Sequence, residues 1–337
     1  MGSERPQGRA APSPAPRLDP AAALLFVINA GAGAVDIDAK RAVIEAALSA
    51  GGRTGQLLVC RPAEMAQVAA EAAATAVARD TAMVAVGGDG SINTVAQAAH
   101  AAGCAVGVMP YGTFNYFART HGIPTEPAAA ARLLLDARPF PVQVASVNDR
   151  VFLVNASLGL YPDLLQDREA YKARFGRSRW VAFGAAVATL LRAQRRLRLR
   201  IELDTTVRDL RTLTLFIGNN RLQLQQMGLE PDDTLAGAPG SGTMAAVVLR
   251  PIGTLAMIGL MLRGALGTLG EAAGVEGFEF RHMVVKPTLA PGRRSIKVAF
   301  DGEVARMRAP LDIQVLDKPL YLLKAAPGPA DAEVPAP

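Results

Sequence analysis

The sequence predicts an α/β protein in which a three-layer N-terminal domain with a parallel sheet precedes a mainly antiparallel β domain with helical insertions. Up to residue 141, short apolar runs alternate with Ala-rich stretches of helical periodicity, which is typical of βαβ units. Beyond that point, apolar and polar residues alternate in short runs bounded by Gly, Asp, Asn and Pro, which indicates antiparallel strands. The length of 337 residues favours two domains.

The first half contains strand-like runs separated by helix-like stretches. Strands are expected over residues 24–29, 56–60, 81–86 and 105–109. Helices are expected over residues 38–50, 62–79, 91–102 and 127–136. Strands separated by helices pair in parallel through right-handed crossovers, so helices should cover both faces of this sheet.

The second half is expected to be rich in β-structure. Its predicted strands span residues 142–147, 151–155, 197–203, 212–218, 244–249, 283–286, 295–300 and 311–316, and its helical insertions lie near 172–195 and 254–269. We therefore place one domain over residues 21–141 and a second over 142–324. The Ala- and Pro-rich ends predict disordered tails over residues 1–20 and 325–337.

Positive charge is concentrated in one segment of the chain. The 36 basic and 30 acidic residues give a formal +6, and residues 168–200 alone hold ten Lys or Arg against Glu169. The two cysteines form no disulfide framework, and the N-terminus lacks the apolar core of a secretory signal, so we expect a cytoplasmic protein. The apolar runs 180–191 and 251–262 are too short to span a bilayer, which takes roughly 18–20 residues.

Three Gly-containing turns point to a phosphate site. They span Asn29–Gly33, Gly87–Ser91 and Pro110–Asn115, and each follows an expected parallel strand. The carboxyl ends of such strands share one edge of the sheet, where ligands bind in α/β folds. Glycines let the backbone approach a phosphate, and the start of the next helix supplies free N–H donors. No Gly-Lys-Ser/Thr sequence makes this a Walker A motif, and a dinucleotide fingerprint would need glycine at Asp36.

Longer motifs in the same order resemble one enzyme family. The stretches GGDGSIN (87–93), PYGTFNYFA (110–118) and FDGE (300–303) are similar to the diacylglycerol kinase catalytic family, which includes sphingosine kinases and bacterial lipid kinases. Residues 155–162 and 216–221 are similar to its bacterial branch. The resemblance extends over roughly residues 24–324.

The resemblance implies an ATP-dependent phosphotransferase with an alcohol group as acceptor, a lipid kinase with diacylglycerol-like substrates favoured. The N-terminal domain would be the nucleotide domain, and the lipid substrate would meet ATP in the cleft between the domains. The implied ATP-binding residues are Asn29, Gly31, Gly87, Gly88, Asp89, Gly90, Ser91, Gly112, Thr113, Asn115 and Glu303. Asp89 would lie beside the phosphates and a hydrated Mg²⁺, because a carboxylate next to phosphates requires a cation.

Two carboxylates near the C-terminus are candidates for the chemistry. Asp301 and Glu303 follow the strand 295–300, and residues i and i+2 on a strand share a face, so both should point into the cleft. Phosphoryl transfer requires the proton of the attacking hydroxyl to be accepted. By the resemblance, Asp301 is the general base, Glu303 assists it or contacts the nucleotide, and Asp89 completes the catalytic set. An ordinary Asp-Gly turn with solvated acids is the alternative.

The basic segment is the candidate contact with an anionic membrane, on its inner face. An apolar helix flanked by arginines binds anionic lipid surfaces. The residues expected to face the membrane are Arg174, Arg177, Arg179, Trp180, Arg192, Arg195 and Arg196. A solvated helix followed by an Arg-Leu strand is the alternative. Nucleic acid is not expected as a partner, because the segment has few aromatic residues for stacking.

Two other functions stay open at this point. A NAD kinase-like enzyme would share the Gly-Gly-Asp-Gly turn, but residues 110–118 and 155–162 are similar to lipid kinases. A non-catalytic nucleotide- or lipid-binding regulator is disfavoured by the intact Asp89, Asp301 and Glu303. The oligomeric state is left open.

Overall fold

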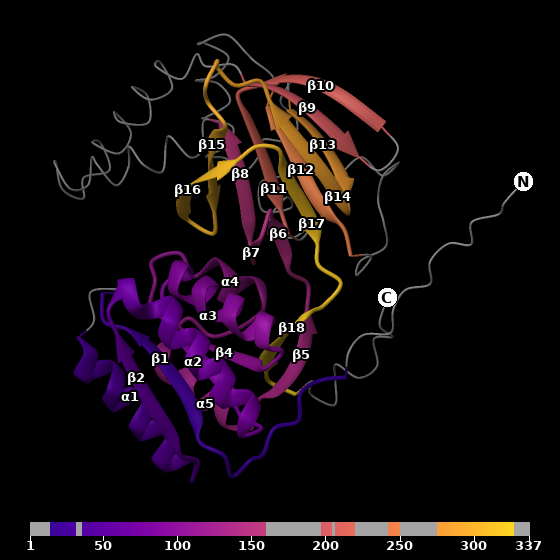
Figure 1. The fold of residues 1–337 in the computed structure, drawn as a ribbon. Coiled ribbons are helices and arrows are strands. Elements are labelled where there is room, and N and C mark those ends of the chain that lie inside the picture. Colours follow the sequence, from indigo (N-terminus) through magenta and orange to yellow (C-terminus); the bar gives the residue numbers. More distant parts are fainter. Residues whose placement is uncertain are drawn as a thin grey trace, which may run out of the picture.

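An α/β part and a β-rich part make up the computed structural model (Figure 1). The structure describes residues 14–31, 36–159, 197–203, 206–219, 242–249 and 275–326. The helical insertions expected near 172–195 and 254–269 lie outside these ranges. No helix within the described ranges combines the length and the apolar character needed to cross a membrane.

The sheet of the α/β part is six-stranded, with the order β2-β1-β3-β4-β18-β5. Its strands are β1 (Leu24–Asn29), β2 (Gly55–Cys60), β3 (Ala82–Gly87), β4 (Ala105–Pro110), β5 (Arg138–Val142) and β18 (Leu320–Lys324). All neighbouring pairs are parallel except β18 with β5. The predicted parallel sheet is confirmed.

Helices cover both faces of this sheet, as predicted. They are α1 (Ile37–Ala50), α2 (Met65–Ala78), α3 (Asp89–Ala102), α4 (Tyr116–Thr120) and α5 (Pro127–Asp136), with a 3₁₀ turn, η1 (Pro62–Glu64), before α2. Leu25 and Val27 of β1 share a core with α2 and α3, whereas Phe26 and Ile28 share a core with α1 and α5. A strand buried on both faces needs an uninterrupted apolar run, which is what β1 has. The short helix α4 is not predicted from the sequence.

The β-rich part consists of two six-stranded sheets, and all their pairings are antiparallel. One sheet has the order β10 (Thr206–Thr212), β9 (Leu197–Leu203), β14 (His282–Pro287), β17 (Leu311–Val315), β6 (Ala145–Val147), β7 (Arg150–Phe152). The other has the order β13 (Val275–Phe280), β12 (Met244–Leu249), β11 (Thr214–Gly218), β8 (Asn155–Gly159), β15 (Ser295–Phe300), β16 (Glu303–Arg308). Ile201 and Ile313 of the first sheet share one core with Leu158 and Val298 of the second. The predicted antiparallel character is confirmed.

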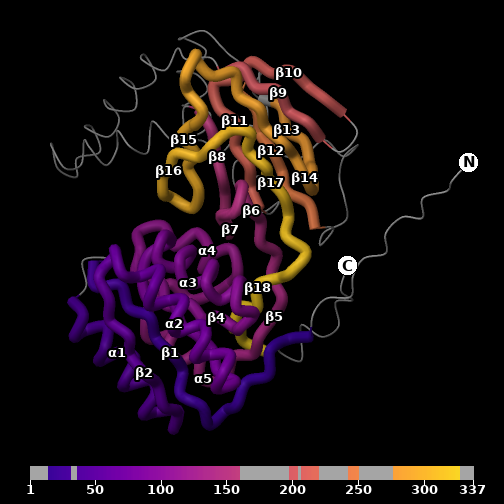
Figure 2. Tube along the Cα trace, viewed as in Figure 1, coloured from indigo at the N-terminus to yellow at the C-terminus, as the bar shows by residue number. Residues whose placement is uncertain are grey.

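The chain passes between the two parts twice, and the two passages run side by side (Figure 2). One leads from β5 to β6, and the other leads from β17 back to β18. By sequence, residues 320–324 are grouped with the second domain, whereas β18 pairs with β4 and β5 in the first sheet. The reason is visible in its residues: Leu322 packs in one core of that sheet and Tyr321 in the other, so β18 needs helices on both sides. The division into domains at residue 141 stays a prediction.

The expected N-terminal tail is too long. Leu18 packs against the core that contains Phe26 and Ile44. The Asp19 N–H donates to the Asp80 carbonyl at 2.7 Å. The chain is therefore anchored before residue 20, whereas residues 1–13 and 327–337 lie outside the described ranges.

Candidate functional site

The three Gly-containing turns meet at one edge of the sheet, as predicted. They follow β1, β3 and β4, which are neighbours in the sheet. Asn29 links the first two turns, because its Nδ2 donates to Ser91 Oγ at 2.8 Å while its Oδ1 accepts from the Gly31 N–H at 2.8 Å. Gly33 lies outside the described residues.

The second and third turns touch through two glycines. A Cβ on Gly112 would lie 2.9 Å from Gly88 Cα, so position 112 has no room for a side chain without separating the turns. Asn115 Oδ1 accepts from the Gly112 N–H at 2.9 Å, and the Tyr111 N–H donates to the Gly87 carbonyl at 2.8 Å. The close approach of two backbones therefore shapes this edge, and the N–H groups of Gly112 and Tyr111 hold the two turns in place.

The side chain of Asp89 reaches from the start of α3 to the backbone of α4. Asp89 is the first residue of α3, after the N-cap Gly88, and its Oδ1 accepts from the Phe117 N–H at 3.5 Å. Burial raises the pKa of Asp89, and the N–H groups of Phe117, Asn115 and Tyr116 oppose that shift. The carboxylate is half-buried, so it remains available to a ligand at the turn.

Asp301 and Gly302 form a two-residue turn and do not extend β15. Their φ angles are 47° and 87°, and Phe300 pairs directly with Glu303, as in a type I′ hairpin, for which Asp-Gly is a favoured pair. The prediction that Asp301 and Glu303 share a strand face is therefore wrong, because the turn interrupts the alternation of side chains. The two carboxylates point to different places.

The Asp301 carboxylate is buried and accepts four N–H bonds. Its Oδ1 accepts from the Val154 and Asn155 N–H groups at 2.8 and 3.0 Å, and its Oδ2 accepts from the Leu153 N–H and Asn93 Nδ2, both at 2.7 Å. A carboxylate offers about four lone-pair sites, so these donors occupy them all. Burial raises the pKa of Asp301 to about 6, although the four donors favour the charged form.

Glu303 reaches from the β-rich part to the Gly87–Ser91 turn. Its side chain is exposed, and its carboxylate lies against the Cα of Gly90, where a Cβ would clash with it. Gly90 belongs to the first turn of α3, where unpaired N–H groups and a partial positive charge stabilise an anion. Glycine at position 90 therefore lets a carboxylate from a distant part of the chain approach the phosphate-type turn.

Lys40 is a residue of the site that sequence reasoning missed. Its side chain on α1 is fully buried, with Nζ 3.4 Å from the Asn29 carbonyl oxygen and 5.2 Å from the centroid of the Tyr111 ring. Burial lowers the pKa of Lys40, and the nearby Asp36 opposes that shift. The only sequence signal was a lysine in the first turn of the helix that follows the Asn29 turn, which is too common to be specific.

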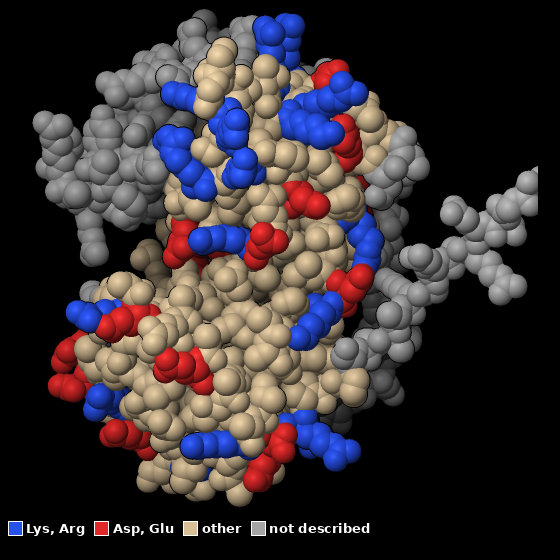
Figure 3. Space-filling view, in the orientation of Figure 1, with Lys and Arg blue, Asp and Glu red and all other residues tan. Residues whose placement is uncertain are grey.

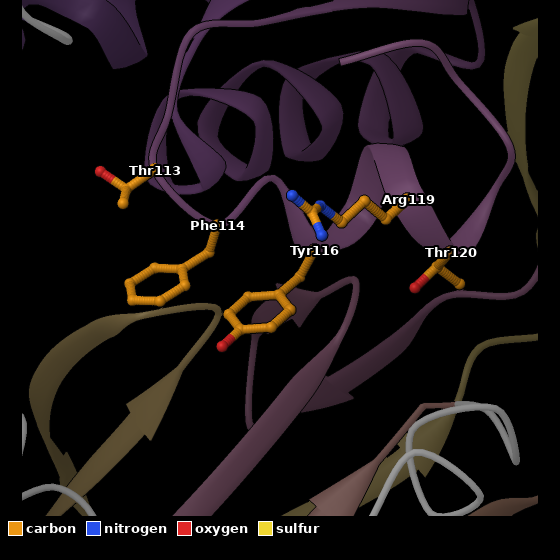
Figure 4. Close-up of a pocket in the computed structure, with 5 residues that line it drawn as sticks. All are labelled: Thr113, Phe114, Tyr116, Arg119 and Thr120. Carbon is orange, nitrogen blue, oxygen red and sulfur yellow. The ribbon is translucent and has the colours of Figure 1, made fainter.

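A pocket of about 260 Å³ lies over α4 and the loop before it (Figure 4). It is lined by Thr113, Phe114, Tyr116, Arg119 and Thr120. The rings of Phe114 and Tyr116 are stacked, with centroids 5.2 Å apart and planes at 5°, and the two residues are 39% and 41% exposed. Figure 4 shows both rings on the same side of the loop, with Arg119 and Thr120 farther along. The pocket thus combines an aromatic surface with hydroxyl and guanidinium donors.

The described residues leave the predicted metal and membrane contacts as predictions. Within the described residues, no group of three or more His, Cys, Asp or Glu side chains could hold a metal ion. The residues predicted to face a membrane, Arg174, Arg177, Arg179, Trp180, Arg192, Arg195 and Arg196, lie outside the described ranges.

Comparison with known sequences points to one family. Residues 23–147 match the profile described as "Diacylglycerol kinase catalytic domain". A Klebsiella pneumoniae protein named "Probable lipid kinase YegS-like" is 42% identical over 79 residues, which is 23% of this chain and 27% of that protein. A Cronobacter sakazakii protein of the same name is 32% identical over 121 residues, 34% of this chain and 40% of that protein. In both alignments the chain covers less than half of the relative's length.

Solved structures share the fold over nearly the whole chain. A crystal structure of a diacylglycerol kinase from Bacillus anthracis superposes with a TM-score of 0.60 at 16% identity, covering 92% of this chain and 98% of that one. A second structure from the same organism has a TM-score of 0.66 at 20% identity. The predicted resemblance is therefore confirmed: residues 23–147 match the diacylglycerol kinase catalytic domain model, and the chain shares the fold of these solved structures.

Proposed function

We propose that this protein is an ATP-dependent lipid kinase that transfers the γ-phosphoryl group of ATP to the hydroxyl of a diacylglycerol-like lipid. The observation that carries the proposal is the position of Glu303, whose carboxylate comes from the β-rich part to the first turn of α3. A group that can accept a proton thereby lies beside a turn suited to phosphates. The names of the relatives, which contain "lipid kinase", support the same reaction.

ATP would bind along the edge where the three turns meet. The backbone at Gly31, at Gly87–Gly90 and at Gly112 would lie against the phosphates, with Ser91, Asn29 and Asn115 fixing the turns and Thr113 at the margin. The close contact of Gly88 and Gly112 supports this, because it brings the turns after β3 and β4 together beside the start of α3. Lys40 would add positive charge behind Asn29.

Mg²⁺ fits this site through Asp89. The ion usually takes one or two carboxylates together with phosphate oxygens and waters, so it needs no larger cluster of acidic side chains. Asp89 is a half-buried carboxylate next to the phosphate-type turn, and it would hold the hydrated ion through water. Bound there with ATP, Mg²⁺ would neutralise charge on the phosphates.

The proposed transfer requires one proton acceptor. The hydroxyl oxygen of the lipid bonds to the γ-phosphorus while the bond from that phosphorus to the bridging oxygen breaks, which leaves ADP. We assign the hydroxyl proton to Glu303, whose exposed carboxylate has unused lone pairs, and not to Asp301, whose four bonds occupy its own. Asp301 becomes a positioning residue that holds the turn before Glu303.

The acceptor lipid would lie at the pocket of Figure 4. The stacked Phe114 and Tyr116 rings offer apolar area to the first methylenes of the acyl chains. Thr113, Thr120 and Arg119 supply donors for the ester oxygens near the hydroxyl. A pocket of about 260 Å³ has room for the glycerol region of a lipid, not for its full acyl chains.

One incubation tests the proposal against its alternatives. The protein, Mg²⁺ and γ-labelled ATP are mixed with a panel of detergent-dispersed lipids and, separately, with NAD. We expect label in a lipid that carries a free hydroxyl. Label in NAD alone would support the NAD kinase-like alternative, and nucleotide binding without any transfer would support a non-catalytic regulator.

A further inference from the structure

Lys40 occupies a position of α1 at which the helix packs on the sheet. The buried face of α1 recurs at helical spacing and consists of Lys40, Ile44, Ala47 and Leu48. A lysine is seldom fully buried, because its ammonium group then loses the water that stabilises the charge. On the face drawn in Figure 3, Lys and Arg side chains lie at the surface of both parts. Lys40 is 0% exposed, so interactions inside the protein must offset that loss of water.

The ammonium group of Lys40 joins the first and the third of the Gly-containing turns. Its Nζ donates to the Asn29 carbonyl at 3.4 Å. The same Nζ lies 5.2 Å from the centroid of the Tyr111 ring, which is within the range of a cation–π contact. Asp36, the exposed N-cap of α1, is a nearby charge of opposite sign. The buried charge therefore contacts groups that belong to two of the turns.

Hydrogen bonds join the other two pairs of turns. Asn29 Nδ2 donates to Ser91 Oγ at 2.8 Å, which links the first turn to the second. The Tyr111 N–H donates to the Gly87 carbonyl at 2.8 Å, which links the third turn to the second. Lys40 completes the set, so each turn is linked to both of the others.

We propose that Lys40 is a positioning residue for the phosphates of the nucleotide and acts through Asn29 and Tyr111. The inference rests on the proposed function, because the three turns are the proposed phosphate site. When the turns are linked in pairs, the site is assembled before the nucleotide arrives, and binding does not have to order it. The buried ammonium also adds positive charge at low dielectric beside a polyanion. An apolar residue would fill the same place on the sheet, but it would leave the first and third turns unlinked.

Nucleotide binding to Lys40→Met tests this role without any lipid. Methionine keeps an unbranched apolar side chain and removes the charge, so ATP should bind about tenfold more weakly while the urea midpoint stays the same or rises. The matched control, Arg41→Met, removes a cation from the exposed face of the same helix and should change ATP affinity less than about twofold. Adenosine, which carries no phosphate, should displace a fluorescent ATP analogue equally well, relative to that analogue's own affinity, from the wild type and from Lys40→Met.

A double-mutant cycle tests the contact with Tyr111. Tyr111→Leu removes the ring and should weaken ATP binding about fivefold. If Lys40 acts through that ring, Lys40→Met/Tyr111→Leu should bind ATP no more than about twofold more weakly than Lys40→Met alone.

Four results would overturn the role of Lys40. They are losses that multiply in the double variant, an equal loss in Arg41→Met, an equal loss for adenosine, and a fall in the urea midpoint of Lys40→Met with unchanged ATP affinity. Weaker ATP binding by Lys40→Met, in a protein that phosphorylates no lipid, would overturn the proposed kinase activity and leave this role intact.

Discussion

Asn93 Nδ2 donates to Asp301 Oδ2 at 2.7 Å, and this bond joins α3 of the α/β part to the β15–β16 turn. The same nitrogen donates to the Val151 carbonyl at 3.0 Å. Both residues are buried, at 8% and 5% exposed, so water screens the bond little. Since Glu303 comes two residues after Asp301, the bond also helps to fix the backbone from which the Glu303 side chain extends.

Replacing Asn93 by Ala should destabilise the protein and impair catalysis. The change removes one donor from a buried carboxylate, for which we expect a loss of about 1–3 kcal/mol in the free energy of unfolding measured with urea. Asn93→Asp is the matched variant, because it keeps the shape but faces Asp301 with a second carboxylate. Its defect should exceed that of Asn93→Ala at neutral pH and shrink on acidification. Equal stability of the wild type and Asn93→Ala would contradict this account of the link.

The stability of the protein should depend on the ionisation of Asp301. Burial raises the pKa of this carboxyl from its ordinary 3.8 to about 6. The folded chain therefore binds the proton more tightly than the unfolded chain, and this stabilisation is complete below about pH 4 and lost as the pH rises through about 6. The urea midpoint of the wild type, relative to Asp301→Asn, should fall over that interval. A relative midpoint that rises instead would mean that the four N–H donors outweigh burial.

Glu303→Gln should lower turnover without lowering stability. Its exposed carboxylate supports no fold contact that the amide would break, whereas loss of a proton acceptor costs about 10²–10⁴ in kcat. Asp301→Asn should behave differently, because its new NH₂ group would face N–H donors and destabilise the fold. Turnover that survives Glu303→Gln but vanishes in a folded Asp301→Asn protein would return the role of base to Asp301.

Gly90→Ala should displace the Glu303 carboxylate from α3. The added Cβ would occupy the space of that carboxylate, while alanine favours the helix by about 1 kcal/mol over glycine. We therefore expect a folded protein with reduced turnover. The double variant Gly90→Ala/Glu303→Ala should be at least as stable as Gly90→Ala, since the clash is gone, yet it should stay inactive. Normal turnover of Gly90→Ala would show that Glu303 acts from another position.

The sequence was informative where a pattern has one structural meaning. The apolar run of β1 and the helix after it require a covered parallel sheet, and the turns at Asn29, Gly87 and Gly112 had to meet once their strands were neighbours. The place of β18 in the first sheet was not predicted. Its pairing with β4 joins residues more than two hundred positions apart, and a local sequence pattern does not reveal such a contact.

The role of Asp301 could not be predicted for a different reason. Its spacing from Glu303 fits either a strand or a two-residue turn, and only the φ angles of the turn decide where the carboxylate points. The N–H groups of residues 153–155 that bind it belong to another turn, whose proximity depends on the pairing of β8 with β15. Lys40 and the Phe114–Tyr116 stack likewise depend on tertiary contacts that residue type does not reveal.

Truncating the aromatic pair should weaken binding of the acceptor and spare that of ATP. Phe114→Ala/Tyr116→Ala removes the two stacked rings, and we expect the KM for a short-chain diacylglycerol to rise at least tenfold, which corresponds to about 1–2 kcal/mol. The phosphate-type turns keep their bonds through Asn115 and Asn29, so the KM for ATP should change little. Tyr116→Phe is the matched control, because it keeps the stack and removes only the hydroxyl. If the KM for ATP rises in the double alanine variant while that of the lipid is unchanged, the rings bind the nucleobase, and the acceptor must approach Glu303 from the β-rich side.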